Sequence, residues 1–173
     1  MSDLTRDVFW LIVDATRPKG IFAALHAGAM QNYLEILTEE QIIDYERQFR
    51  ELMAESYRWD LWGAAYIVNG GCSDDGFQYF RAWLISQGRS YYEKCLANPE
   101  AVGSRADRED RTEDEEFMYC AAGAYKEKTG RELPEITVTR TDKPIGQQWD
   151  EADLPKLYPK LAKKFRLARD HDY

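Results

Sequence analysis

Two neighbouring carboxylates, Asp74 and Asp75, follow a glycine turn at Gly70 and Gly71 and stand at the start of a segment with helical spacing. Carboxylates beside a turn can ligate a metal ion or act as general acid and base. Acids in this position also cap a helix and interact favourably with its dipole. The spacing matches no calcium-binding loop, so we predict no metal site and no cofactor. The catalytic and the capping roles both stay open.

Arg81 lies seven residues after Asp74, which places the two side chains on the same face of the expected helix. A guanidinium on a pocket wall can clamp a carboxylate or phosphate with two parallel hydrogen bonds. The same polar stripe also suits the solvent side of a helix. If the stripe faces a pocket, we expect Arg81 to meet an anion there and the two acids to orient its polar groups.

Aromatic side chains recur at helical spacing on both sides of the glycine turn. Such stripes usually form core, but they also wall pockets for planar or cationic ligands. We expect most of these rings to be buried and one or two to line a cleft near Asn69. The candidate ligand-binding residues are Trp59, Trp62, Tyr66, Asn69, Asp74, Asp75, Phe77, Arg81 and Trp83.

Two helices must position these residues. Segment 60–69 is apolar and ends at two glycines, which allow the left-handed backbone of a helix C-cap. Ser73 or Asp74 can cap the next helix, which runs to Gln87. Apolar residues at helical spacing predict further helices, and Thr38 with Gln41 forms a capping box before the longest one. One expected helix begins near Thr5, and the others comprise residues of about 21–37, 38–58, 91–97, 117–129 and 155–165.

The remaining segments carry little regular structure. Only residues 135–141 alternate like a strand and are rich in β-branched side chains. The polar, largely acidic stretch within 98–113 predicts a mobile loop, and 166–173 a charged tail. The predicted fold is therefore mainly α: one domain over residues 1–173, an irregular bundle of six to eight helices with at most a minor β element near 135–141.

Composition limits the classes of partner. The chain has 173 residues and a net charge of -8, which argues against binding to nucleic acid or to anionic lipid. The start lacks the pattern of a signal peptide, and no segment reaches the length of a membrane span. Three cysteines at wide spacings fit neither a disulfide framework nor a zinc site. We therefore expect a cytoplasmic protein with reduced thiols; the sequence carries no signal for its oligomeric state.

Three segments occur in a distinctive order: FWLIVDATR, YRWDLWGAAYIVNGGCSDDGFQYFRAWLISQGR and EFMYCAAGAYKEKTG. Together they resemble the domain-of-unknown-function family DUF4240, which is found in bacteria and is frequent in actinomycetes. The resemblance covers residues of about 5–165 and implies no established activity. Its central motif falls on Trp59, Asp60, Trp62, Gly63, Asn69, Gly70, Gly71, Asp74, Asp75, Phe77, Phe80, Arg81, Trp83 and Gly88.

Three functions fit these patterns. The first is a small ligand-binding or regulatory protein whose polar and aromatic pocket, within 59–88, takes a small molecule or peptide. The second is an enzyme of a specialised bacterial pathway that uses Asp74 or Asp75 as acid or base. The third is a protein-interaction module, such as an immunity or adaptor protein, acting through its acidic surface. A closed pocket holding a carboxyl group of raised pKa would favour the enzyme.

Overall fold

Helix caps set the local structure of this chain. The structure, a computed structural model, describes residues 4–19, 25–107 and 112–166. Thr5 Oγ1 accepts a hydrogen bond from the Val8 amide at the start of α1 (Arg6–Thr16). Thr38 and Gln41 form the predicted capping box of α3 (Glu39–Glu55). Ser73 Oγ accepts from the Gly76 amide and begins α5 (Asp74–Ser86). These starts were predictable because each depends on neighbouring residues alone.

Several other helices begin without a side-chain hydrogen bond at the N-cap, and Gly130 ends α7 in the left-handed conformation with φ 70°. The further α-helices of the described residues are α2 (His26–Glu35), α4 (Trp59–Val68), α6 (Arg89–Ala97), α7 (Cys120–Thr129), α8 (Leu154–Leu157) and α9 (Pro159–Arg166). Short 3-10 helices are η2 (Pro99–Ser104), η3 (Glu116–Tyr119) and η4 (Glu151–Asp153).

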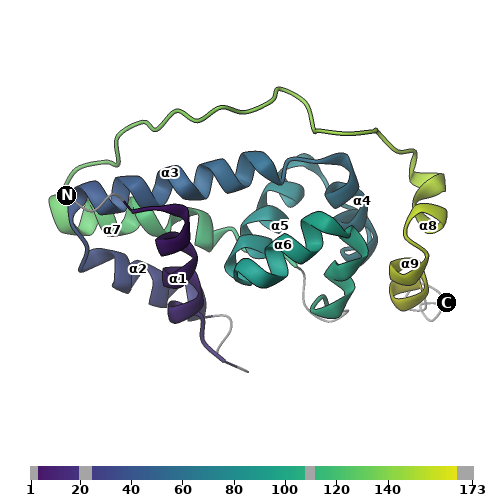
Figure 1. The fold of residues 1–173 in the computed structure, drawn as a ribbon, viewed down its shortest axis with the longest axis horizontal. Helices are drawn as coiled ribbons and strands as arrows, with labels where there is room; N and C mark the ends of the chain where they lie inside the picture. Colours follow the sequence, from purple (N-terminus) through teal and green to yellow (C-terminus); the bar gives the residue numbers. More distant parts are fainter. Residues whose placement is uncertain (1–3, 20–24, 108–111, 167–173) are drawn as a thin grey trace.

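The helices pack around one continuous hydrophobic core, so the chain forms a single, mainly α domain. Helix α3 runs along one side of the molecule; α1, α2 and α7 gather at one end, and α8 and α9 lie at the other (Figure 1). Phe77 and Phe80 of α5 are fully buried where the two ends meet. Burial of each phenylalanine side chain stabilises the fold by about 2 to 3 kcal/mol.

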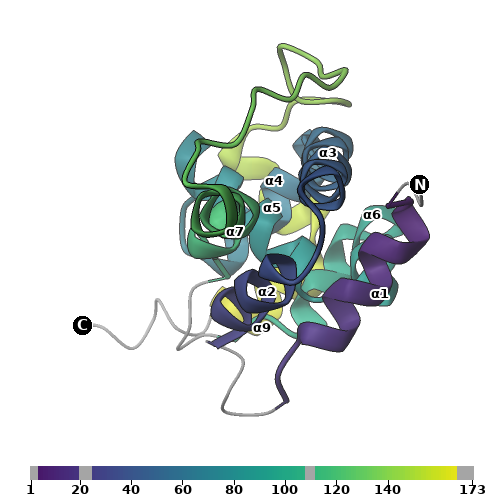
Figure 2. The ribbon, with the colours of Figure 1, turned by 90° about the vertical axis from the view of Figure 1, so that its left-hand side faces the viewer.

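After α7 the chain crosses the molecule without regular structure, and we call residues 131–150 the crossing segment. It runs above α3 from the end of α7 to α8 (Figures 1 and 2). Arg50 Nη1 donates to the Ile136 carbonyl at 2.9 Å, and an isolated β-bridge joins Arg58 to Ile145. Residues 135–141, where we expected at most a minor β element, are extended but form no strand with any described residue.

The described residues cover three further predicted segments only in part. The helix predicted over 21–37 begins at His26, and residues 20–24 lie outside the described part. The loop predicted over 98–113 contains helix η2, whose Val102 is fully buried; residues 108–111 are not described. Of the predicted tail, 166–173, only Arg166 is described, as the last residue of α9.

The last predicted helix, 155–165, is in fact two. Tyr158 leaves the helical conformation, with φ -128° and ψ 65°, and separates α8 from α9. Proline disfavours a helical backbone in the residue before it, so Pro159 accounts for the break. Within the described ranges, no helix combines the length and the apolar character needed to cross a membrane.

Candidate functional site

Three of the predicted aromatic residues form a stack between α4 and α5. The rings of Trp59 and Trp62 lie 5.2 Å apart and those of Trp62 and Phe77 4.9 Å apart, each pair within 9° of parallel. Trp62 Nε1 also donates to the Cys72 carbonyl at 2.9 Å, which ties α4 to the turn before α5. The stack therefore holds the two helices together, and it uses ring faces that a ligand would otherwise contact.

Arg81 is also engaged within the protein. Its Nη1 donates to the Met53 carbonyl at 2.6 Å, and its guanidinium lies over the rings of Tyr57 and Phe77 at 4.8 and 5.0 Å. Burial lowers the pKa of this guanidinium to about 10. Since Met53 is in the last turns of α3, where the helix dipole favours a cation, Arg81 stabilises the contact between α3 and α5.

The polar residues at the glycine turn have separate environments. Asp74 and Asp75 are exposed in the first turn of α5. Asn69 Oδ1 accepts hydrogen bonds from the amide and the hydroxyl of Thr112 at 3.1 and 3.0 Å. Asn69 Nδ2 is buried and has no hydrogen-bond partner among the described residues. Trp83 packs edge-on against Tyr91.

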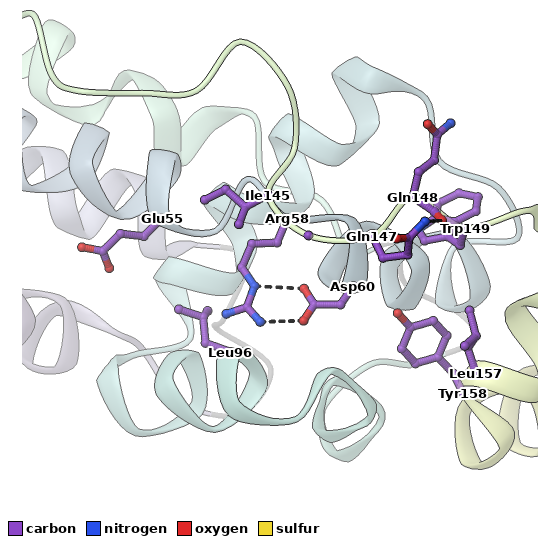
Figure 3. Close-up of a pocket in the computed structure, with 11 residues that line it drawn as sticks. Glu55, Arg58, Asp60, Leu96, Ile145, Gln147, Gln148, Trp149, Leu157 and Tyr158 are labelled. Atoms are coloured by element: carbon purple, nitrogen blue, oxygen red, sulfur yellow. Dashed lines mark hydrogen bonds and ion pairs between the residues drawn. The ribbon is translucent and has the colours of Figure 1, made fainter.

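A cavity of about 580 Å³ opens at the other end of α4 (Figure 3). None of the nine predicted ligand-binding residues lines it. Its lining comes from the end of α3, the start of α4, α6, the crossing segment and α8: Glu55, Arg58, Asp60, Leu96, Ile145, Gly146, Gln147, Gln148, Trp149, Leu157 and Tyr158.

Arg58 and Asp60 form the charged part of the cavity wall. Arg58 Nε donates to Asp60 Oδ1 at 3.0 Å and Nη2 to Oδ2 at 2.6 Å, so the pair is bidentate. Arg58 is the extended N-cap residue of α4, and the Leu61 amide donates to Asp60 Oδ1 at 2.7 Å. A carboxylate in the first turn of a helix is stabilised by the dipole, which holds the pair in place.

The crossing segment supplies the facing wall through Trp149. Trp149 Nε1 donates to the Trp59 carbonyl at 2.7 Å, and its ring meets those of Trp59 and Tyr66 edge-on. The Ile145 amide donates to the Tyr57 carbonyl at 2.8 Å, and the Trp59 amide donates back to Ile145 at 2.9 Å. Trp59 and Tyr66, two of the predicted ligand-binding residues, thus pack against Trp149 and support this cavity wall without lining the cavity.

Tyr158 completes the cavity on the side of α8. The residue is buried, and its hydroxyl points into the cavity towards Asp60 (Figure 3). Burial, with a smaller effect of the Asp60 charge, raises the pKa of Tyr158 to about 12. The phenol is therefore neutral at physiological pH and can donate or accept a hydrogen bond.

Gly63 explains how the C-terminal part docks on α4. A Cβ atom at this position would lie 2.7 Å from Tyr158 Cε2, and 3.1 Å from both Leu154 Cδ2 and Trp149 Nε1. The sequence contained a signal for this contact, because a glycine inside an apolar helix often marks close packing. The sequence predicts a pocket at the opposite end of α4, and that prediction did not include the crossing segment, which lines this cavity.

The family match covers only part of the residues that line the cavity. Residues 4–127 match the family described as "Protein of unknown function (DUF4240)". The chain belongs to the DUF4240 family. The match ends before the crossing segment, so the DUF4240 region supplies four cavity-lining residues and the part after residue 127 supplies seven. No curated protein and no solved structure matches the chain at a significant level.

The charged residues near the cavity offer limited chemistry. Among the described residues, no three His, Cys, Asp or Glu side chains are grouped to hold a metal ion. Burial raises the pKa of the carboxyl groups of Glu46 and Asp114, but neither residue lines the cavity. The cavity is therefore better suited to hydrogen bonding and packing than to proton transfer by a carboxyl group.

Proposed function

We propose that this DUF4240 protein binds a small organic ligand in the cavity between the start of α4, α6 and the C-terminal part of the chain. The observation that supports the proposal is the cavity itself. Its volume of about 580 Å³ lies in the range of about 300–1,000 Å³ typical of small-molecule sites. Apolar side chains from three elements lie there beside polar groups that can orient a ligand, a combination found in small-molecule sites.

The arrangement also suggests a regulatory role. Two walls of the cavity belong to the crossing segment and α8, which dock on α4 through Gly63 and few hydrogen bonds. A ligand that contacts both walls would favour the docked arrangement, since binding stabilises the state that binds. The ligand would then control how stably the crossing segment and α8 dock on α4.

The two other functions have less support. An enzyme using Asp74 or Asp75 would need one of these acids in a cavity, and both are exposed at the start of α5. An immunity or adaptor module would act through a broad surface patch and would not need the cavity. The DUF4240 resemblance suggests a bacterium, of actinomycete type, as the source, and the reduced state of all three cysteines agrees with the cytoplasm.

The proposal can be tested with a variant that fills the cavity. Leu96 lines the opening, and Leu96→Trp adds an indole ring there. Leu11→Trp makes the same substitution at an exposed position of α1, with 68% of the residue exposed, and serves as the matched control. We would compare the wild type and both variants in a thermal-shift screen against a library of metabolites.

We expect a subset of compounds to raise the melting temperature of the wild type and of Leu11→Trp, and to leave Leu96→Trp unchanged. Ligand at about a hundredfold excess over its Kd adds about 2.7 kcal/mol to stability, which such a screen detects easily. Compounds that stabilise all three proteins equally bind outside the cavity. A screen with only such compounds, or with none, rejects the proposal.

A further inference from the structure

Every fixed charge in the cavity already has a partner of opposite charge. Arg58 and Asp60 satisfy each other through two hydrogen bonds. Glu55, at the rim, is paired with Arg6, whose Nη1 lies 2.6 Å from Glu55 Oε1. An anionic ligand would have to compete with Asp60 for the guanidinium. A cationic ligand would have to compete with Arg58 or Arg6 for a carboxylate.

The hydrogen-bonding groups that remain available to a ligand are either neutral or belong to a charged residue that already has a partner of opposite charge. The Tyr158 hydroxyl and Arg58 Nη1 have no hydrogen bond to any described residue, and both lie on the cavity surface. Gln147 uses its Nε2 for the Gln148 carbonyl at 3.3 Å and keeps its amide oxygen as an acceptor. The cavity thus offers a donor at Arg58, an acceptor at Gln147 and a hydroxyl at Tyr158, which a ligand group able to donate and accept can satisfy.

A hydroxyl is such a group, because it carries one donor and two acceptor sites. Apolar side chains also line the cavity, with Leu96 and Leu157 on opposite sides and the Trp149 ring between the crossing segment and α4. Such surfaces suit the C–H face of a ring whose hydroxyls point outwards. The Tyr158 hydroxyl, Arg58 Nη1 and the Gln147 amide oxygen can each meet one hydroxyl of such a ring.

We propose that the ligand is a neutral polyhydroxylated molecule, a sugar or a cyclic polyol. This inference rests on the proposed function, since it names the ligand class of the same cavity. Tyr158 donates to or accepts from one ligand hydroxyl, and Arg58 Nη1 donates to a second. The ring of the ligand packs between the apolar side chains. The net charge of the protein, -8, further disfavours anionic sugars such as sugar phosphates.

Tyr158→Phe tests the inference without a folding defect, because the hydroxyl it removes makes no bond within the described protein. Tyr119→Phe, at a tyrosine in η3 that is 55% exposed and outside the cavity lining, is the matched control. Isothermal titration would use glucose, maltose, trehalose and myo-inositol as neutral probes. Spermidine, phosphate, citrate and adenine would represent cations, anions and planar neutral molecules.

We expect at least one neutral polyol to bind the wild type and Tyr119→Phe equally, and to bind Tyr158→Phe about tenfold more weakly. Titration separates this binding from the general stabilisation by sugars as excluded osmolytes, which releases no saturable heat. Polyol binding that is the same in all three proteins would overturn the inference.

The probes also distinguish failure of the ligand class from failure of the site. Binding of spermidine, phosphate, citrate or adenine that Leu96→Trp abolishes, with no polyol bound, would reject the polyol and keep the cavity as a ligand site. If neither these probes nor the wider metabolite library binds in a way that Leu96→Trp removes, both proposals are wrong.

Discussion

Gly63 on α4 and Tyr158 after α8 approach so closely that a methyl group on the glycine would lie 2.7 Å from the tyrosine ring. The two residues belong to different parts of the chain, since Gly63 lies in the DUF4240 match and Tyr158 beyond it. The contact brings the Tyr158 hydroxyl to the cavity and leaves no room for a larger residue. The cavity therefore depends on a glycine that has no direct contact with its interior.

Gly63→Ala should weaken the docking of the C-terminal part. Overpacking costs about 1 to 3 kcal/mol, while alanine gains about 1 kcal/mol of helix propensity over glycine, so we expect a net loss of about 1 kcal/mol. Hydrogen exchange should accelerate in residues 145–158, whereas α2 and α7 should exchange at the wild-type rate. Differential scanning calorimetry measures the net stability.

Gly28→Ala is the matched control, because a Cβ at this exposed position of α2 meets no atom within 4 Å. We expect it to stabilise the protein by about 0.5 to 1 kcal/mol, since only the helix propensity changes. If Gly63→Ala behaved like Gly28→Ala, the tight contact with Tyr158 would have no energetic importance.

Arg81→Met should destabilise the fold and leave ligand binding intact. The variant keeps an apolar stem but loses the hydrogen bond to Met53 and the cation–π contacts with Tyr57 and Phe77, a loss of about 2 to 3 kcal/mol. Asp75→Ala, on the exposed first turn of α5, should change stability by less than about 1 kcal/mol. Urea unfolding measures both. Equal effects of the two variants would contradict the structural role of Arg81.

The sequence predicted the features that depend on near neighbours. The caps at Thr38 and Ser73 and the left-handed Gly70 need only residues within one helical turn, and all three are present. The role of Arg81 was not predictable in this way, because its partner Met53 lies 28 residues earlier. The same holds for the Trp149–Trp59 hydrogen bond, which spans 90 residues.

The cavity beside the crossing segment was not predicted, for the same reason. A dense set of aromatic and polar residues at Trp62 and Asp74 indicates either a site or tight packing, and the sequence cannot show which ring faces are already covered. The Trp59, Trp62 and Phe77 stack covers them here. The crossing segment has no periodic pattern of its own, so its contribution to a cavity appears only once its contacts with α4 are known.

The three cysteines should differ sharply in reactivity. Cys95 and Cys120 are buried, and burial raises the pKa of their thiols to about 11 and about 12. Cys72 is partly exposed in the turn before α5. Since the thiolate is the reactive form, iodoacetamide at pH 8 should modify Cys72 in the folded protein and all three cysteines in urea. Mass spectrometry of tryptic peptides identifies the sites; rapid labelling of Cys120 in the native state would contradict the burial of this thiol.

His26 should make the protein less stable in mild acid. Its ring is 3% exposed, with Nε2 3.1 Å from Thr16 Oγ1 and the ring packed on Phe117. Burial and, to a smaller degree, the charge of Arg17 lower its pKa to about 4. Between its ordinary pKa of about 6.5 and about 4, the unfolded chain takes up a proton at His26 that the folded chain does not. The free energy of unfolding therefore falls as the pH decreases through this window, by about 2 to 3 kcal/mol at pH 4.5.

His26→Gln isolates this effect, because glutamine does not titrate while Glu46 and Asp114, whose raised pKa values act in the opposite direction, are retained in both proteins. Urea unfolding at pH 7 and pH 4.5 gives the difference in stability between wild type and variant at each pH. We expect the wild type to lose about 2 to 3 kcal/mol relative to the variant between the two conditions. A difference that is the same at both pH values would mean that the folded protein protonates His26 as readily as the unfolded chain does.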